Sequence, residues 1–482
     1  MEAYPPPVQN ESSRPASLQS VGCFLKPYLS TGTPPVLGKM FILGRLKPFR
    51  FPARLDQYLN QLSPLFLATV IIFVLVHGYM LIQLSNGGSD LVDADIPKSL
   101  MLLNGQNPYS VQPWASPYPP LLLLIDSAII RFTSLFTLQS STDAISQNIR
   151  IIGLVADATV AILIYHYLRG KTADPLTPLL SASLFLTLPA LSISPLYFFH
   201  SDTFGYPILA LSLVALAAHR YLIGTSLLAT ATIFKIHPIL ALPLVIVWLA
   251  RTKTVRTATP SILSTITILS LGLLLPLTIP GYTQSILGFN LSNNGNGTTL
   301  TSILSLANHI LPAQLQISPT TPFADQVWIT ATLALYTIIL GTVWMWARRL
   351  GPVDIVLLGL LAWLIPLKIE YTHYVAWAII PILMRGQLRQ TIPVIGLLQL
   401  ADTLSYWSWW PSTSPIPGIS TFYGLAATSA IYRFLGLAAL GFVLYAARKT
   451  TRFIPSWNIT ENEVEADQTI RQNREAPLIL SH

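Results

Sequence analysis

The sequence predicts an all-α, polytopic integral membrane protein with about 12 transmembrane helices. Of its 482 residues, 52% are hydrophobic and only 10% are charged, whereas soluble globular chains carry about 25% charged residues. Apolar runs of about 20 residues, the length that spans a bilayer as a helix, recur along most of the chain. This composition excludes a cytosolic enzyme, a nucleic-acid-binding domain and a secreted disulfide scaffold.

Two polar tails flank the predicted membrane domain, which we expect to occupy residues 61–452. Residues 1–60 are basic and rich in Pro and Ser, and residues 453–482 are polar with several acidic side chains. We expect residues 1–60 to be a mostly disordered cytoplasmic tail, because this composition buries too little apolar surface to fold, and residues 453–482 to be a second cytoplasmic tail. No apolar segment lies at the start of the chain, so we expect no cleaved signal peptide.

Twelve apolar segments are candidate membrane spans. They are 64–84, 149–168, 176–194, 204–222, 225–236, 238–250, 260–280, 326–347, 353–368, 374–384, 391–405 and 425–447. Several are shorter than a full span, and Pro238 separates 225–236 from 238–250. Short or broken helices at membrane depth need protein or water around their exposed backbone, so these segments predict a cavity.

Lys and Arg set the predicted orientation, because loops rich in these residues stay on the cytoplasmic side. The basic clusters are 45–54, Arg169/Lys171, Arg251/Lys253/Arg256, Arg348/Arg349, Arg385/Arg389 and Arg448/Lys449/Arg452. All six fall on one side only if the apolar stretch 118–136 does not cross. That stretch contains Asp126 and Arg131, which would be costly at the bilayer centre. We therefore expect an interfacial helix in the first outer loop and two cytoplasmic termini.

Charged side chains collect on the outer face in this topology. Asp90 and Asp93 lie in the first outer loop, just beyond the first span. A carboxylate at this boundary can act as general base on an acceptor hydroxyl, although a solvated acidic loop has the same pattern. The single cysteine, Cys23, excludes an intramolecular disulfide and a Cys-based metal site. We expect no resident cofactor, and nothing in the sequence indicates a divalent metal.

Lys235 and His237 lie at the outer end of the broken span, inside an otherwise apolar run. An ionisable residue at membrane depth is a functional candidate by default. An ammonium and an imidazole two residues apart can bind a lipid phosphate and stabilise a phosphate leaving group. The alternative is that Lys235 extends to the lipid headgroups.

Three further residues are candidate substrate ligands. Asp202 lies in the second outer loop, where it can orient an acceptor or bind a divalent ion, or cap the helix that opens at Thr203. Glu370 and His373 are spaced i,i+3, so on a helix they share a face. This spacing is a weak signal for a metal, and a His that contacts phosphate is the interpretation we favour.

Short motifs occur in a fixed order along the first half of the chain. They are Leu102-Leu103-Asn104-Gly105-Gln106-Asn107-Pro108-Tyr109, then Tyr118-Pro119-Pro120-Leu121, then Lys235-Ile236-His237-Pro238. In this order they resemble the GT-C superfamily of polyprenyl-phosphate-sugar-dependent glycosyltransferases. Within it, the chain is most similar to the mannosyltransferase-like family of mycobacterial phosphatidylinositol-mannoside enzymes. The motifs support the likeness over residues 64–250.

The resemblance implies a GT-C-like fold and an inverting transfer of a hexose such as mannose at the outer face. The implied donor is a polyprenyl-phosphate sugar, the acceptor is a lipid or glycan, and no nucleic acid takes part. It assigns the catalytic base to Asp90, with Asp93 second, and the phosphate contact to Lys235. The aromatic residue that usually follows the base is not evident in 91–96. The implied location is a prokaryotic cytoplasmic membrane.

Two other functions fit the same sequence features. A transporter or flippase of a lipid-linked saccharide would use broken helices and phosphate-binding cations, but should show paired breaks in its two halves. The sequence has one clear break, near Pro238. A non-catalytic assembly subunit would tolerate single substitutions of the Asp and Lys residues.

Overall fold

The computed structural model describes 63–83, 95–110, 119–135, 141–172, 174–188, 201–285, 312–316, 322–364, 375–388, 391–396, 437–438, 440–441 and 444–445. Every regular element among these residues is a helix, which confirms the predicted all-α class for this part of the chain. The chain divides into two units, Met1–Gln61 and Leu62–His482, and all described residues belong to the second. Both predicted tails lie outside the described residues.

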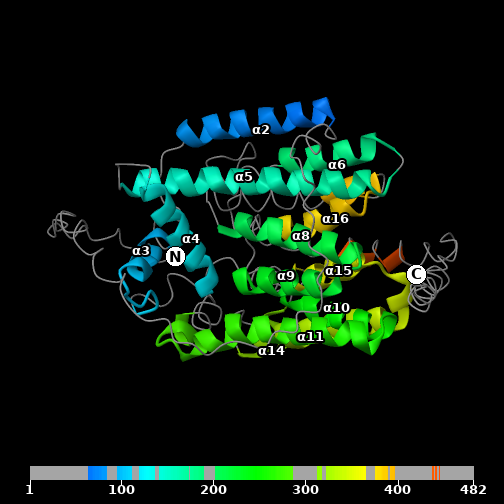
Figure 1. The fold of residues 1–482 in the computed structure, drawn as a ribbon. Helices are drawn as coiled ribbons and strands as arrows, with labels where there is room; N and C mark the ends of the chain where they lie inside the picture. Colours follow the sequence, from blue (N-terminus) through cyan, green and yellow to red (C-terminus); the bar gives the residue numbers. More distant parts are fainter. Residues whose placement is uncertain are drawn as a thin grey trace, which may run out of the picture. The chain divides into compact units, whose positions relative to one another are not determined.

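The first part of the second unit is built around one long helix, α5 (Figure 1). In chain order its helices are α2 (Pro64–Gln83), α3 (Ile96–Leu103), α4 (Pro120–Ser134), α5 (Thr142–Arg169) and α6 (Leu176–Thr187). Ser141 caps α5, because its hydroxyl accepts a hydrogen bond from the backbone N–H of Ala144. Helix α5 contacts α2, α4, α6 and α8, so it connects the first helices to the later ones.

The later helices form a closely packed group in which α15 contacts α8, α10, α14 and α16. The elements are η3 (Ser201–Phe204), α8 (Gly205–Ala217), α9 (Tyr221–Phe234), η4 (His237–Leu240), α10 (Ala241–Thr252), α11 (Val255–Leu269), η5 (Ser270–Leu274), η6 (Leu275–Thr278), η7 (Ala313–Leu315), α14 (Pro322–Trp346), η8 (Ala347–Arg349), α15 (Pro352–Leu364) and α16 (Val375–Met384). Gly359 of α15 lets that helix approach the α10 backbone, because a Cβ there would clash with Ala241.

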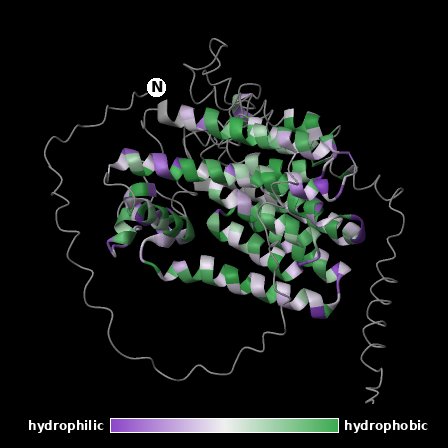
Figure 2. Ribbon diagram, turned by 45° about the horizontal axis from the view of Figure 1, so that its top comes forward, coloured by the Kyte–Doolittle hydropathy of each residue, from purple (hydrophilic) through white to green (hydrophobic). Residues whose placement is uncertain are grey.

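Apolar residues surround most of these helices instead of forming one inward-facing stripe (Figure 2). Leu75 of α2 is 66% exposed, and Leu271 of η5 is 61% exposed. Helices that are apolar on all sides are typical of a protein core or a membrane span.

Two helical stretches among the described residues are long and apolar enough to cross a bilayer, Thr142–Arg169 and Val255–Thr278. They indicate, weakly, an association with a membrane. Most of the other apolar helices in the described part are shorter than a full span. How many of the helices cross a membrane stays a prediction.

Helix boundaries differ from the expected spans at identifiable places. Helix α5 begins at Thr142, whereas the expected span begins at 149. The expected span 260–280 begins at Val255, changes to π-helix at Ser270 and becomes a 3-10 turn at Leu275. Pro276 has no N–H to continue an α-helical ladder, which accounts for the last change. The expected spans 391–405 and 425–447 lie mostly outside the described residues.

Candidate functional site

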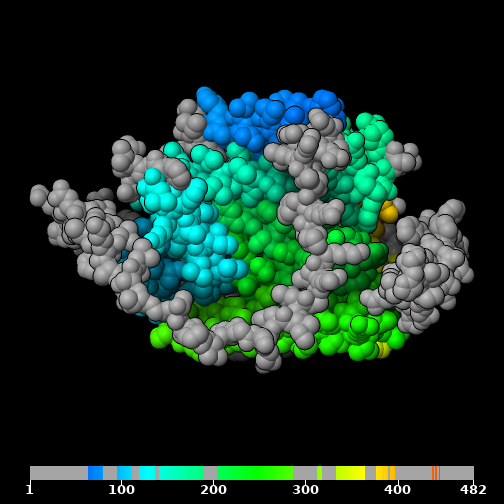
Figure 3. All heavy atoms as spheres, viewed as in Figure 1, coloured from blue at the N-terminus to red at the C-terminus, as the bar shows by residue number. Residues whose placement is uncertain are grey.

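Helices α3 and α4 form a pair that covers one end of the helix group. The Ser127 hydroxyl of α4 donates a hydrogen bond to the Ser99 carbonyl of α3 at 3.1 Å, and the Ser99 hydroxyl donates to the Leu123 carbonyl at 3.4 Å. Small side chains at this contact let the two backbones come close. In Figure 3 the cyan surface of α4 abuts the green surface of later helices.

The apolar face of α4 joins this pair to the end of α9. Leu122 is fully buried against Phe234, the last residue of α9, and Phe204 of η3 packs on the same contact. On the other side, Ile130 of α4 is buried against Ile96 and Ile149. The pair formed by α3 and α4 therefore contacts the beginning of α5, the turn η3 and the residues directly before Lys235.

Two charged residues of α3 are enclosed at this end. Asp95 is 1% exposed and makes no side-chain bond that caps the helix, and Lys98 is 5% exposed. Burial lowers the pKa of the Lys98 ammonium, and the neighbouring Asp95 carboxylate opposes this effect. The Lys98 Nζ has no hydrogen-bond partner among the described residues, and it lies 5.8 Å from the centre of the Tyr109 ring.

Asp126 of α4 is also enclosed. It is fully buried and lies one helical turn after Leu122, on the face that packs toward α9. Arg131, the other charge of this helix, is exposed. Protein therefore shields Asp126, and the expected place of this helix at the membrane interface stays a prediction.

The break between α9 and α10 presents Lys235 and His237. Helix α9 ends at Phe234, and Lys235 is extended, with φ −143° and ψ 129°. Pro238 stands at the start of η4, where a missing N–H is tolerated. Lys235 is 5% exposed and His237 is 3% exposed, so the Lys235 side chain is enclosed by protein and does not extend along the surface.

His237 lies among aromatic rings from three other helices. Its ring centre is 5.9 Å from those of Trp363 in α15 and Trp377 in α16. Trp377 in turn meets Tyr206 of α8 edge-on at 5.2 Å. The buried indole N–H groups of both Trp residues lack a hydrogen-bond acceptor in the described part of the chain. These two indole N–H groups can therefore donate hydrogen bonds to an acceptor such as a phosphate oxygen or a sugar hydroxyl.

Arg150 is a buried cation that the sequence analysis missed. It lies in the third turn of α5, is 2% exposed, and its Nε has no hydrogen-bond partner among the described residues. A charge inside the apolar run 149–168 was a visible signal. Its neighbour Ile149 packs against α3 and α4, so Arg150 belongs to the same end of the helix group.

Only part of the predicted site can be placed. Asp90, Asp93, Glu370 and His373 lie outside the described residues, and the backbone of Asp202 lies in η3 while its side chain is not described. Lys235 and His237 are placed, and they share one break. Within the described ranges, no three His, Cys, Asp or Glu side chains come together as a metal site. Convergence of the first-loop carboxylates with Lys235 therefore stays a prediction.

Comparison with known proteins adds no relative. No protein-family model matches the chain, and no curated protein matches it. The likeness to GT-C glycosyltransferases consequently rests on the short sequence motifs in residues 102–238 and on the predicted membrane spans.

Proposed function

We propose that this protein is a multi-pass membrane glycosyltransferase of the GT-C type. It transfers a hexose such as mannose from a polyprenyl-phosphate donor to a lipid or glycan acceptor at the outer face. About 12 helices cross a prokaryotic cytoplasmic membrane, with both termini in the cytoplasm. One observation carries the proposal: α4, from the first outer loop, packs through Leu122 onto Phe234, the residue before Lys235.

This contact supports the proposal because it places α4, which carries Asp126, beside the break that carries Lys235 and His237. In the proposed reaction, a first-loop carboxylate takes the proton of the acceptor hydroxyl. The freed oxygen attacks the anomeric carbon from the side opposite the phosphate. The bond between that carbon and the phosphate oxygen breaks, and the polyprenyl phosphate leaves with the electron pair. The anomeric configuration is therefore inverted.

Each proposed role follows from charge. Lys235, with His237 and His373, balances the leaving phosphate, and fixed charge of this kind is usually the largest catalytic contribution. Asp90 is the proposed base and Asp93 the second candidate. Asp202 positions the acceptor or a divalent ion, and Glu370 lies beside the donor.

Asp95 is a third candidate for the base, supported by its surroundings. It is a first-loop carboxylate enclosed by protein, as Asp126 is, and it lies beside the enclosed Lys98.

The test uses purified protein in phospholipid vesicles with synthetic polyprenyl-phosphate mannose labelled in the sugar. We expect wild type to transfer label to an acceptor lipid, and Asp90→Asn to abolish transfer while donor binding persists. Asp93→Asn and Asp95→Asn are compared in parallel, and Asp143→Asn, at an exposed position in the first turn of α5, is the matched control. Wild-type turnover by Asp90→Asn would remove its assignment as base, and no transfer by wild type from any polyprenyl-phosphate hexose would overturn the enzymatic proposal.

A flippase is the second candidate, favoured by a second irregular segment. Besides the break at Lys235, the stretch Ser270–Thr278 departs from α-helical geometry. Paired broken helices are typical of transporters. The same vesicles distinguish the two functions, because a flippase moves a fluorescent lipid-linked sugar between leaflets and leaves its glycosidic bond intact.

A further inference from the structure

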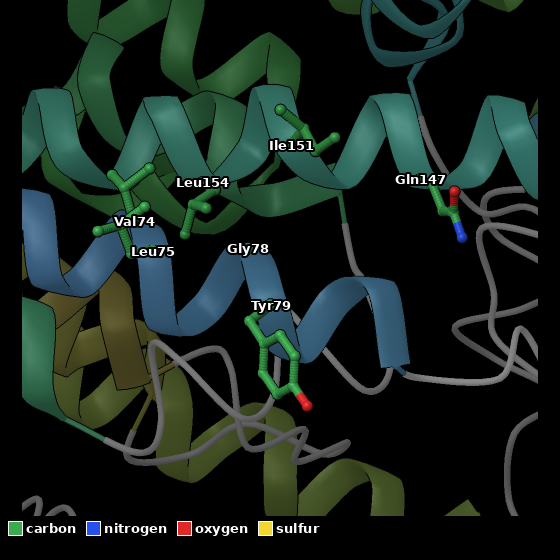
Figure 4. Close-up of a pocket in the computed structure, with 7 residues that line it drawn as sticks. All are labelled: Val74, Leu75, Gly78, Tyr79, Gln147, Ile151 and Leu154. Atoms are coloured by element: carbon green, nitrogen blue, oxygen red, sulfur yellow. The ribbon is translucent and has the colours of Figure 1, made fainter.

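A lateral groove runs between α2 and α5. Its volume is about 420 Å³, within the range of roughly 300–1,000 Å³ that is typical of ligand pockets. The lining residues are Val74, Leu75, Gly78 and Tyr79 of α2, and Gln147, Ile151 and Leu154 of α5. Figure 4 shows these side chains along the two neighbouring helices.

The groove is apolar along its length and polar at one end. Val74, Leu75 and Leu154 stand at one end in Figure 4, and the amide of Gln147 stands at the other. Leu75 is 66% exposed and Ile151 is 48% exposed, so the walls carry large apolar side chains that no other described residue covers. An elongated apolar slot with one terminal amide matches a hydrocarbon chain joined to a polar ester group.

We propose that this groove binds one acyl chain of a bilayer glycerophospholipid, with the ester group next to Gln147. The inference rests on the membrane location in the proposed function but not on its chemistry. The surrounding surface fits this occupant, because α5 is long enough to cross a bilayer and α2 is apolar beside it. Lipid tails are as apolar as Leu, so packing in the slot and a hydrogen bond from Gln147 give the preference for a bound chain.

Gly78 gives a direct way to close the groove. A Cβ built at Gly78 meets no atom within 4 Å, so a larger side chain enters the slot without displacing backbone. Gly341 of α14 is a matched control, because it is also inside a helix and its Cβ position is also open. Gly78→Leu and Gly341→Leu therefore make the same chemical change, and only the first fills the groove.

The experiment uses full-length protein in phosphatidylcholine vesicles that contain a phosphatidylcholine with a photoactivatable diazirine on one acyl chain. After irradiation, peptide mass spectrometry compares label on 74–79 and 147–154 with label on 263–274. The exposed apolar face in 263–274 of α11 and η5 measures ordinary contact with bulk lipid. We expect Gly78→Leu to lower the ratio of groove label to 263–274 label by about fivefold or more, because the added side chain occupies the space of the acyl chain. We expect Gly341→Leu to leave this ratio unchanged.

Each outcome decides a different statement. An equal label ratio in wild type and Gly78→Leu overturns the lipid site. Label on 263–274 with none in the groove also overturns the lipid site. In both cases the membrane location stands. Absence of label from all three segments overturns the membrane location itself. Crosslinks that join two protein copies through 74–79 would identify a second chain as the occupant and also overturn the proposal.

Discussion

The side-chain amide of Asn107 donates a hydrogen bond to the carbonyl oxygen of Pro280 at 2.9 Å and so ties the first-loop motif to the turn after η6. The Oδ1 atom of Asn107 accepts the backbone N–H of Tyr109 at 3.0 Å, and the Tyr109 ring meets Tyr282 edge-on at 5.1 Å. Burial raises the pKa of Tyr282 to about 12 and also raises that of Tyr109, so both stay neutral at physiological pH. This motif therefore has a structural role in holding the loop.

Gly281→Ala should detach the loop from this turn. Gly281 has φ +80°, which favours glycine, and a Cβ there would clash with the carbonyl oxygen of Tyr109. We expect the free energy of unfolding to fall by about 2–4 kcal/mol, from left-handed strain and overpacking together. Denaturant or thermal unfolding in detergent micelles measures this change.

Gly105→Ala separates the two causes. Gly105 has φ +70°, but its Cβ position is open, so this variant has the strain without the clash. We expect it to lose only about 1–2 kcal/mol. Equal losses in the two variants would show that the contact with Tyr109 contributes nothing.

Lys235→Gln should impair transfer much more than binding of the acceptor. Removing one preorganised charge from a leaving group typically lowers kcat by about 10²–10³-fold. Lys253→Gln is the control, because this residue follows α10, at the end opposite the break, and its ammonium lies 4.9 Å from the Tyr221 ring. Radiolabel transfer at saturating donor measures kcat, and a Lys235→Gln enzyme as fast as Lys253→Gln would exclude the phosphate role.

The helices themselves were largely predictable, because their signals are local. Pro120 and Pro352 begin α4 and α15, at positions where proline is favoured, and apolar runs mark the lengths. The π-helical turn at Ser270 was not predictable. It occurs where Gly272 packs directly against Ile233 of α9, a contact between helices that no local pattern reveals.

The candidate site divides in the same way. Lys235 and His237 were predictable, because charge inside an apolar run is conspicuous. Trp363 and Trp377 were not, since Trp is common in membrane helices and only tertiary packing brings both to His237. Arg150 carried the same signal as Lys235, but nothing in the sequence linked it to the first outer loop.

Lys98 should make the free energy of unfolding rise with pH in the alkaline range. Burial lowers its pKa in the folded state below the unfolded value, which is about 10.4. Between the two values the unfolded chain binds more protons, so the free energy of unfolding rises with pH. The contribution of Lys98 to the free energy of unfolding is complete at pH values above the unfolded-state pKa. It is lost as the pH falls through the folded-state pKa.

Lys98→Met removes this titration. Thermal midpoints measured from neutral pH to about pH 10 should rise for wild type relative to Lys98→Met over the alkaline part of the range. Parallel profiles for the two proteins would mean that the Lys98 ammonium is as well solvated in the folded protein as in the unfolded chain.

Asp354, in the first turn of α15, and Arg385, directly after α16, form an ion pair with Nε and Oδ1 2.8 Å apart. Removing one partner from a fully buried pair costs about 3–5 kcal/mol. The Asp354 side chain is 24% exposed, so we expect about 1–3 kcal/mol for Arg385→Leu. Replacing both residues should cost less than the two single changes added together, because no charge is then left unpaired.

A double-mutant cycle on unfolding in detergent measures the coupling, for which we expect about 1–2 kcal/mol. Strictly additive losses would show that the pair does not hold the two helix ends together.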